Sequence, residues 1–156
     1  MRILAPLLLV CSFTAMAEDL PTKKFLSLAA IKTMVAAAEG EAQKRNVQVT
    51  ICIVDESGNL LFLQKADGAT MNTIEFAQKK ARHASKFRSP SKNAADNLAK
   101  GNLQVLAFPD GFPNQGGLPI KMGGQILGGI GVSGAPSEVD EAIGQVAIDA
   151  LLEKYK

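Results

Sequence analysis

The chain has 156 residues, of which 47% are hydrophobic and 21% are charged, with two cysteines and no tryptophan. This composition is ordinary for a globular protein and excludes the disordered, collagen-like and disulfide-rich classes. The formal net charge is only +2, so the charge predicts no nucleic-acid or anionic-membrane partner. A chain of this length fits a single domain with its own hydrophobic core.

The first 17 residues have the pattern of a secretory signal peptide. Arg2 supplies a positive start, residues 3–16 form an apolar run, and Ala15 and Ala17 suit signal peptidase. The run is shorter than the roughly 20 residues that a membrane-spanning helix needs. We therefore expect a signal peptide at 1–17, a mature domain at 18–156 without a transmembrane segment, and a periplasmic or secreted protein.

The first half of the mature chain predicts three helices and a β-hairpin. Apolar residues recur at helical spacing after Ser27, whereas residues 47–53 alternate as in a strand. The expected elements are a helix at 28–45, strands at 47–53 and 60–64, and helices at 72–87 and 91–100. Cys52 lies in the apolar strand and is the only cysteine left after cleavage, so we expect a buried thiol and no intramolecular disulfide.

The second half predicts three strands and a final helix. A strand at 103–108 leads into a turn-rich loop, and strands at 118–122 and 125–133 flank Gly123-Gly124, which suits a two-residue hairpin turn. The last helix begins at Ser137. Because hairpins join antiparallel strands, the order of elements predicts a single-domain α+β fold with a five-stranded, largely antiparallel sheet and packed helices.

The single histidine is a candidate ligand-binding residue. Phe76, His83 and Phe87 lie within about 20° of one line on a helix, with Lys80 alongside. A histidine between two phenylalanines suits a flat aromatic ligand or a haem iron, since imidazole is a haem axial ligand. The alternative is a packed, hydrogen-bonded histidine with no ligand. One histidine and one mature cysteine exclude a zinc site of the Cys/His type.

Small residues on this helix and on the strand at 125–133 allow two interpretations. Ala77, Ala81 and Ala84 form an apolar stripe that lets the helix sit close to the sheet. Gly131 and Ser133 either let other backbone pack close or, with the N-terminus of the last helix, hold a carboxylate through free N–H groups. Residues 131–135 lack the final glycine of a nucleophile elbow, which disfavours a catalytic serine.

Several motifs together resemble a known family, that of the haem-binding protein HbpS and the glycolate-operon protein GlcG. They are VDESGNL at 54–60, KADGA at 65–69, AQKKA at 77–81, GGLPI at 116–120 and GIGVSG at 129–134, followed by Asp140. The resemblance covers essentially the whole mature chain, which is also similar to the C-terminal domain of one type of corrinoid adenosyltransferase. It implies an α+β fold with a five-stranded antiparallel sheet and a homo-oligomer.

Two positions depart from the family pattern. The family usually has Arg-Met-Asp-Gly-Ala at 65–69, where Lys65 here replaces a guanidinium by a point charge. The family commonly has threonine at the position of His83, so the histidine adds a potential axial ligand. The histidine therefore favours haem binding in this chain beyond what the resemblance alone implies.

Two hypotheses of function follow. In the first, the protein binds haem or a related tetrapyrrole, with His83 as the iron ligand, Phe76 and Phe87 as walls, and Lys80 near the propionates. In the second, it is an enzyme or binding protein for a small carboxylate such as a hydroxy acid. Asp67, together with Asp140 or His83, would then act as general acid and base. Gly131, Ser133 and the helix N-terminus would bind the anion. An accessory or structural module is the remaining class.

Overall fold

The computed structural model describes residues 19–155, so the predicted signal peptide lies outside the described residues. The elements in chain order are α1 (Leu28–Lys44), β1 (Thr50–Asp55), β2 (Leu60–Lys65), α2 (Asn72–Phe87), α3 (Ser91–Ala99), the 3₁₀ helix η1 (Leu103–Leu106), β3 (Gly117–Met122), β4 (Gln125–Ser133) and α4 (Ser137–Lys154). No helix among residues 19–155 is both long and apolar enough to cross a bilayer.

The four strands form one antiparallel sheet in the order β2-β1-β4-β3. Both predicted hairpins, β1–β2 and β3–β4, are present. Gly123 and Gly124 make the second turn with φ of 57° and 80°, a conformation that glycine adopts without steric cost. The predicted α+β class is therefore correct.

The prediction of a fifth strand at 103–108 is wrong. Residues 103–106 form η1, whose first turn is capped by the Asn102 side chain accepting from the Gln104 amide at 3.1 Å. Leu103, Leu106 and Phe108 are all exposed, so this segment has no apolar face covered by a sheet. Local capping and the lack of burial thus favour a 3₁₀ helix over the expected strand.

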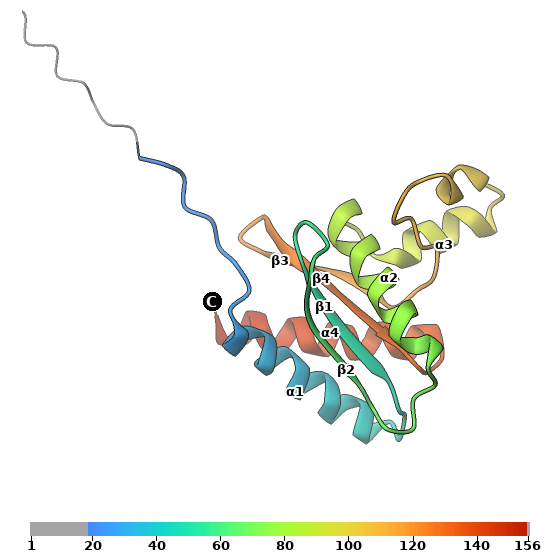
Figure 1. Cartoon of the computed structure of the whole chain (residues 1–156), viewed down its shortest axis with the longest axis horizontal. Helices are drawn as coiled ribbons and strands as arrows, with labels where there is room; N and C mark the ends of the chain where they lie inside the picture. The colour runs from blue at the N-terminus through green and yellow to red at the C-terminus, as the bar shows by residue number, and fades with distance from the viewer. Residues whose placement is uncertain (1–18, 156) are drawn as a thin grey trace, which may run out of the picture.

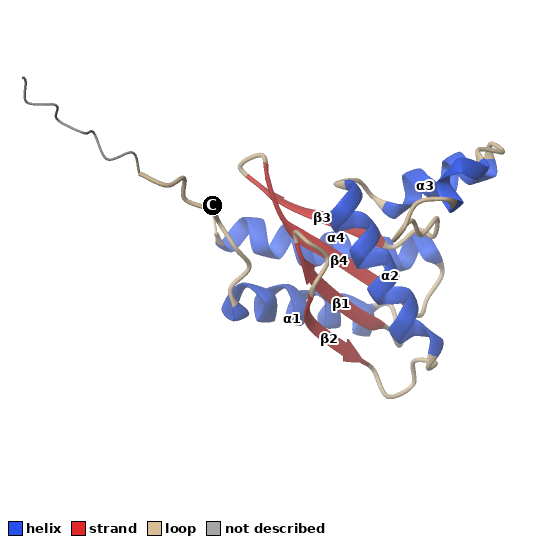
Figure 2. Cartoon of the chain, turned by 45° about the horizontal axis from the view of Figure 1, so that its top comes forward, coloured by secondary structure: helices blue, strands red, loops and turns tan. Residues whose placement is uncertain are grey.

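Helices cover both faces of the sheet (Figures 1 and 2). The main core lies between the sheet and the paired helices α1 and α4, where Met34 and Ile143 meet Ile53 and Ile130 of the two central strands. Helix α2 crosses the opposite face, over β1, β4 and β3. Helix α3 extends away from the sheet beside α2 (Figure 1).

Helix α2 lies unusually close to β4 because both elements present small residues. Ala77 and Ala81 are fully buried, as the predicted alanine stripe requires. A Cβ at Gly131 would lie 2.0 Å from the Ala77 carbonyl oxygen, and one at Gly129 would lie 2.3 Å from the Ala81 carbonyl oxygen. These glycines thus allow backbone to pack on backbone, which fixes α2 and its outward-facing side chains on the sheet.

Candidate ligand-binding site

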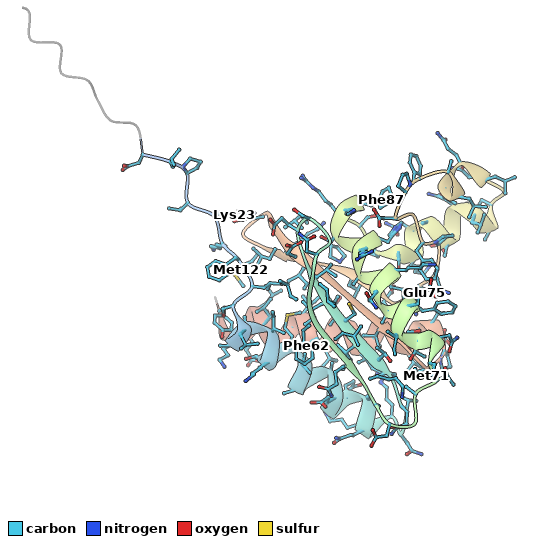
Figure 3. The ribbon with its side chains drawn as sticks, viewed as in Figure 1. Lys23, Phe62, Met71, Glu75, Phe87 and Met122 are labelled. Carbon is cyan, nitrogen blue, oxygen red and sulfur yellow. The ribbon has the colours of Figure 1, made fainter. Side chains whose placement is uncertain are left out.

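The predicted stripe of Phe76, His83 and Phe87 exists, and the segment between η1 and β3 lies across it. The Phe112 ring packs on Phe76 with 5.6 Å between centroids, and the Phe108 ring meets the edge of Phe87 at 5.8 Å. Figure 3 shows Phe87 at the C-terminal end of α2, with Met71 and Glu75 near the other end. The segment 108–112 therefore covers the stripe in this conformation.

The His83 imidazole has a defined hydrogen bond. Its Nδ1 accepts from the Phe112 backbone amide at 3.0 Å, and its ring stacks on Phe87 at 4.6 Å and 22°. The side chain is 4% exposed, and this burial lowers the pKa of His83 below its ordinary value. The ring is therefore neutral at pH 7, and because Nδ1 accepts a hydrogen bond, the ring hydrogen resides on Nε2.

A small cleft of about 180 Å³ opens beside His83. Helix α2 and the segment after η1 contribute aromatic side chains to it, and the α2–α3 turn and α3 contribute mainly polar ones. The side chains that give it this character are His83, Phe87, Phe108, Ser89, Asn93 and Asn97. Every residue that lines the cleft is uncharged at neutral pH, so the cleft itself favours an uncharged, flat group with a few hydrogen-bonding atoms.

Lys80 does not lie on the aromatic stripe. The prediction that it lies near haem propionates is therefore wrong. Its Nζ donates to Asp140 Oδ2 and to the Val132 carbonyl, each at 2.9 Å, and both charged side chains are only 2% exposed. Asp140 Oδ1 accepts in turn from the Ala135 amide at 2.9 Å. Burial raises the pKa of the Asp140 carboxyl even though Lys80 acts to lower it. Lys80 turns inward because it borders the alanine face of α2.

Comparisons with known proteins now identify the family. The model of the HbpS-like family, described as haem degrading protein HbpS-like, matches residues 26–149. GlcG from Escherichia coli K12 is 34% identical over 112 residues, which is 72% of this chain and 84% of GlcG. This chain belongs to the HbpS-like family.

Solved structures of HbpS-like proteins have the same fold. A double mutant of Streptomyces reticuli HbpS is 30% identical with a TM-score of 0.78, covering 90% of this chain and 97% of that one. A complex of PduOC with haem is 28% identical with a TM-score of 0.75, covering 81% and 95%. The predicted resemblance to HbpS, GlcG and the corrinoid adenosyltransferase is confirmed.

The residues named for the small-carboxylate hypothesis are not assembled in this HbpS-like chain. Asp140 is occupied by Lys80, and Asp67 lies on the exposed turn after β2. Gly131 is covered by the backbone of α2, and Ser133 is 4% exposed at the end of β4. Because the backbone of α2 covers Gly131 and Lys80 pairs with Asp140, the geometry favours the packing interpretation of Gly131.

Sequence patterns missed the partners of His83. Phe108 and Phe112 lie in a loop without periodicity, and their contacts with α2 join residues about 20 to 36 positions apart, which no helical or strand period encodes. Asn93 and Asn97 carried a usable signal, since residues four apart on a helix share a face. The candidate site thus combines one predicted stripe with neighbours that the sequence did not predict.

The lowered pKa of His83 predicts a pH-dependent stability. The unfolded chain binds a proton at His83 near the ordinary pKa of 6.5, whereas the folded chain binds it only at lower pH. The free energy of unfolding should therefore fall as the pH drops below about 6.5. In His83→Gln, which keeps a hydrogen-bond acceptor without the titration, urea unfolding at pH 7.5 and 5.5 should give a smaller difference. Equal pH dependence in both proteins would contradict this prediction.

Proposed function

We propose that this protein binds haem or a closely related tetrapyrrole on the outer stripe of α2. The observation that carries the proposal is the aromatic stripe itself, in which His83 is stacked on Phe87 and aligned with Phe76. Membership of the HbpS-like family and the similarity to a PduOC–haem complex support the same ligand.

The residues of the stripe fit a porphyrin ring by their chemistry. Flat aromatic side chains offer large apolar area and stacking faces for a macrocycle. Phe87 is 39% exposed although it is a large apolar residue, so binding would remove its remaining surface from water. The cleft of about 180 Å³ is smaller than the roughly 300 to 1,000 Å³ of typical ligand pockets, so a macrocycle has to extend beyond it.

His83 can act as an axial ligand only after its hydrogen bond with the Phe112 amide is broken. A neutral imidazole that binds a metal through Nε2 carries its proton on Nδ1 and usually donates it to an acceptor. Here Nδ1 faces the Phe112 amide, which is itself a donor. Ligation by His83 and the His83–Phe112 hydrogen bond are therefore mutually exclusive, so the proposal requires that the segment 108–112 moves when haem binds. A bound haem would supply iron-centred chemistry at this position.

A haem titration followed by absorbance tests the proposal. Purified protein without residues 1–17 should give a shifted Soret band that saturates at a defined stoichiometry. An unshifted spectrum, or binding without saturation as on a nonspecific apolar surface, would contradict the proposal. A protein that ignores haem but gains thermal stability from a hydroxy acid would instead support the small-carboxylate hypothesis.

We further propose that the protein is exported, on the strength of the amino-terminal sequence pattern alone. Cleavage after Ala17 would give a chain that starts at Glu18. Intact-mass analysis of protein recovered from a secreting host should give the mass of residues 18–156. A mass that retains the first 17 residues would contradict export by this route.

We also propose a homo-oligomer, as the family resemblance suggests. The alanines of α2 lie against β4 and cannot serve as the interface. Exposed apolar side chains remain at Leu60 and Leu61 on the edge strand β2 and at Met71 before α2, which are 51%, 40% and 73% exposed. Light scattering at micromolar concentration should give a multiple of the chain mass, and a monomer mass would contradict the proposal.

A further inference from the structure

A groove runs along the outer face of α2, next to the aromatic stripe. One part, of about 370 Å³, follows the helix from Met71 to Arg82. A second part, of about 200 Å³, lies between α2 and the turn at 110–112. Lys79 and Arg82 line both parts, so the two parts adjoin at these cations.

Two cations, Lys79 and Arg82, and two anions, Glu75 and Asp110, line this groove, but their ion pairs leave Arg82 without a partner within the described part of the chain. Lys79 pairs with Glu75 at 2.7 Å and lies over the Phe112 ring at 5.7 Å from its centroid, while Asp110 pairs with Lys86 at 2.6 Å. Arg82 is exposed and makes no ion pair with any side chain of residues 19–155. Its guanidinium is thus the cation of the groove that is free to bind an external anion.

We propose that Arg82, assisted by Lys79, binds the carboxylates of the ligand, which for haem are the propionates. This inference rests on the proposed function and assigns to Arg82 the role that Lys80 cannot fill, because Lys80 is buried with Asp140. A guanidinium presents a fork of N–H donors that matches a carboxylate, so it is better suited than an ammonium to such a contact.

The position of the groove agrees with this role. The groove adjoins the uncharged cleft beside His83, since Gly111 lines both. When the segment 108–112 moves off the stripe, the cleft and the groove become one continuous surface. An amphipathic ligand can then place its apolar ring against the stripe and its acidic edge against Arg82.

The test compares haem with haem dimethyl ester, which has the same macrocycle without free carboxylates. Arg82→Gln should weaken haem binding by roughly tenfold and leave binding of the ester unchanged, because the ester has no charge for Arg82 to contact. Lys100→Gln, at an exposed position after α3, is the matched control and should change neither. Far-UV circular dichroism checks that the variants are folded.

Three results would overturn the inference. Unchanged haem affinity in Arg82→Gln would remove Arg82 from the site while leaving haem binding intact. An equal loss of haem and ester would assign Arg82 to ring packing or to the fold and not to carboxylate binding. Wild-type protein that binds neither haem nor the ester would overturn the proposed function, and this inference with it.

Discussion

Replacing Lys80 by methionine should destabilise the protein by about 3–5 kcal/mol at neutral pH, the cost of leaving one partner of a buried ion pair alone. Methionine keeps most of the side-chain volume but loses both donations from Nζ, to Asp140 and to the Val132 carbonyl. The Asp140 carboxylate would remain 2% exposed with the Ala135 amide as its neighbour. Its pKa, which burial already raises, should rise further, so the loss should shrink in acid as Asp140 protonates.

Two variants make this prediction specific. Lys79→Met changes the adjacent residue, whose ion pair with Glu75 is half exposed, and should cost less than about 1 kcal/mol. The double variant Lys80→Met/Asp140→Leu removes both charges and should recover much of the stability lost in the single variant. Urea unfolding of the three variants and the wild type gives the comparison. If Lys80→Met costs no more than Lys79→Met, the pair does not hold the fold as the geometry implies.

His83→Ala should change the haem spectrum and weaken haem binding by at least about tenfold, or 1.4 kcal/mol. The variant lacks an axial nitrogen, so the Soret band should shift or broaden. The apo protein should also lose about 1 kcal/mol, because the Phe112 amide is left without its acceptor in a partly buried position. Absorbance titration and urea unfolding measure the two effects separately.

His83→Phe separates iron ligation from ring packing. Phenylalanine keeps a flat ring that can stack on Phe87 but has no nitrogen to bind iron. If His83 ligates iron, the alanine and phenylalanine variants should share the altered spectrum. If His83 only packs against the macrocycle, His83→Phe should resemble the wild type in spectrum and affinity.

Most of the fold follows from local patterns in the sequence. Helices α1, α2 and α4 have apolar residues at helical spacing, and the two hairpins have alternating strands with turn residues between them. The segment at 103–108 has a strand-like pattern too, yet it forms η1, since no sheet edge buries it. A strand pattern predicts a strand only where the fold supplies a partner.

Helical periodicity predicts part of the candidate site, but the contacts between elements lie outside its reach. Helical periodicity places Phe76, His83 and Phe87 on one line, but Lys80 lies at the border of that line and can face either way. The partner that draws it inward, Asp140, is 60 residues away in the sequence. The Phe112 amide that fixes the His83 tautomer is 29 residues away. Such long-range contacts depend on how the elements pack, which single-sequence periodicity does not contain.

The central claim is that haem binds to the α2 stripe in place of the segment 108–112. Hydrogen–deuterium exchange of that segment, with and without haem, tests it most directly. The Phe112 amide, which donates to His83 Nδ1 in the free protein, should exchange faster when haem is bound, because Nδ1 then carries a proton and cannot accept. Unchanged or slower exchange at 108–112 under saturating haem would place the ligand elsewhere and contradict the account.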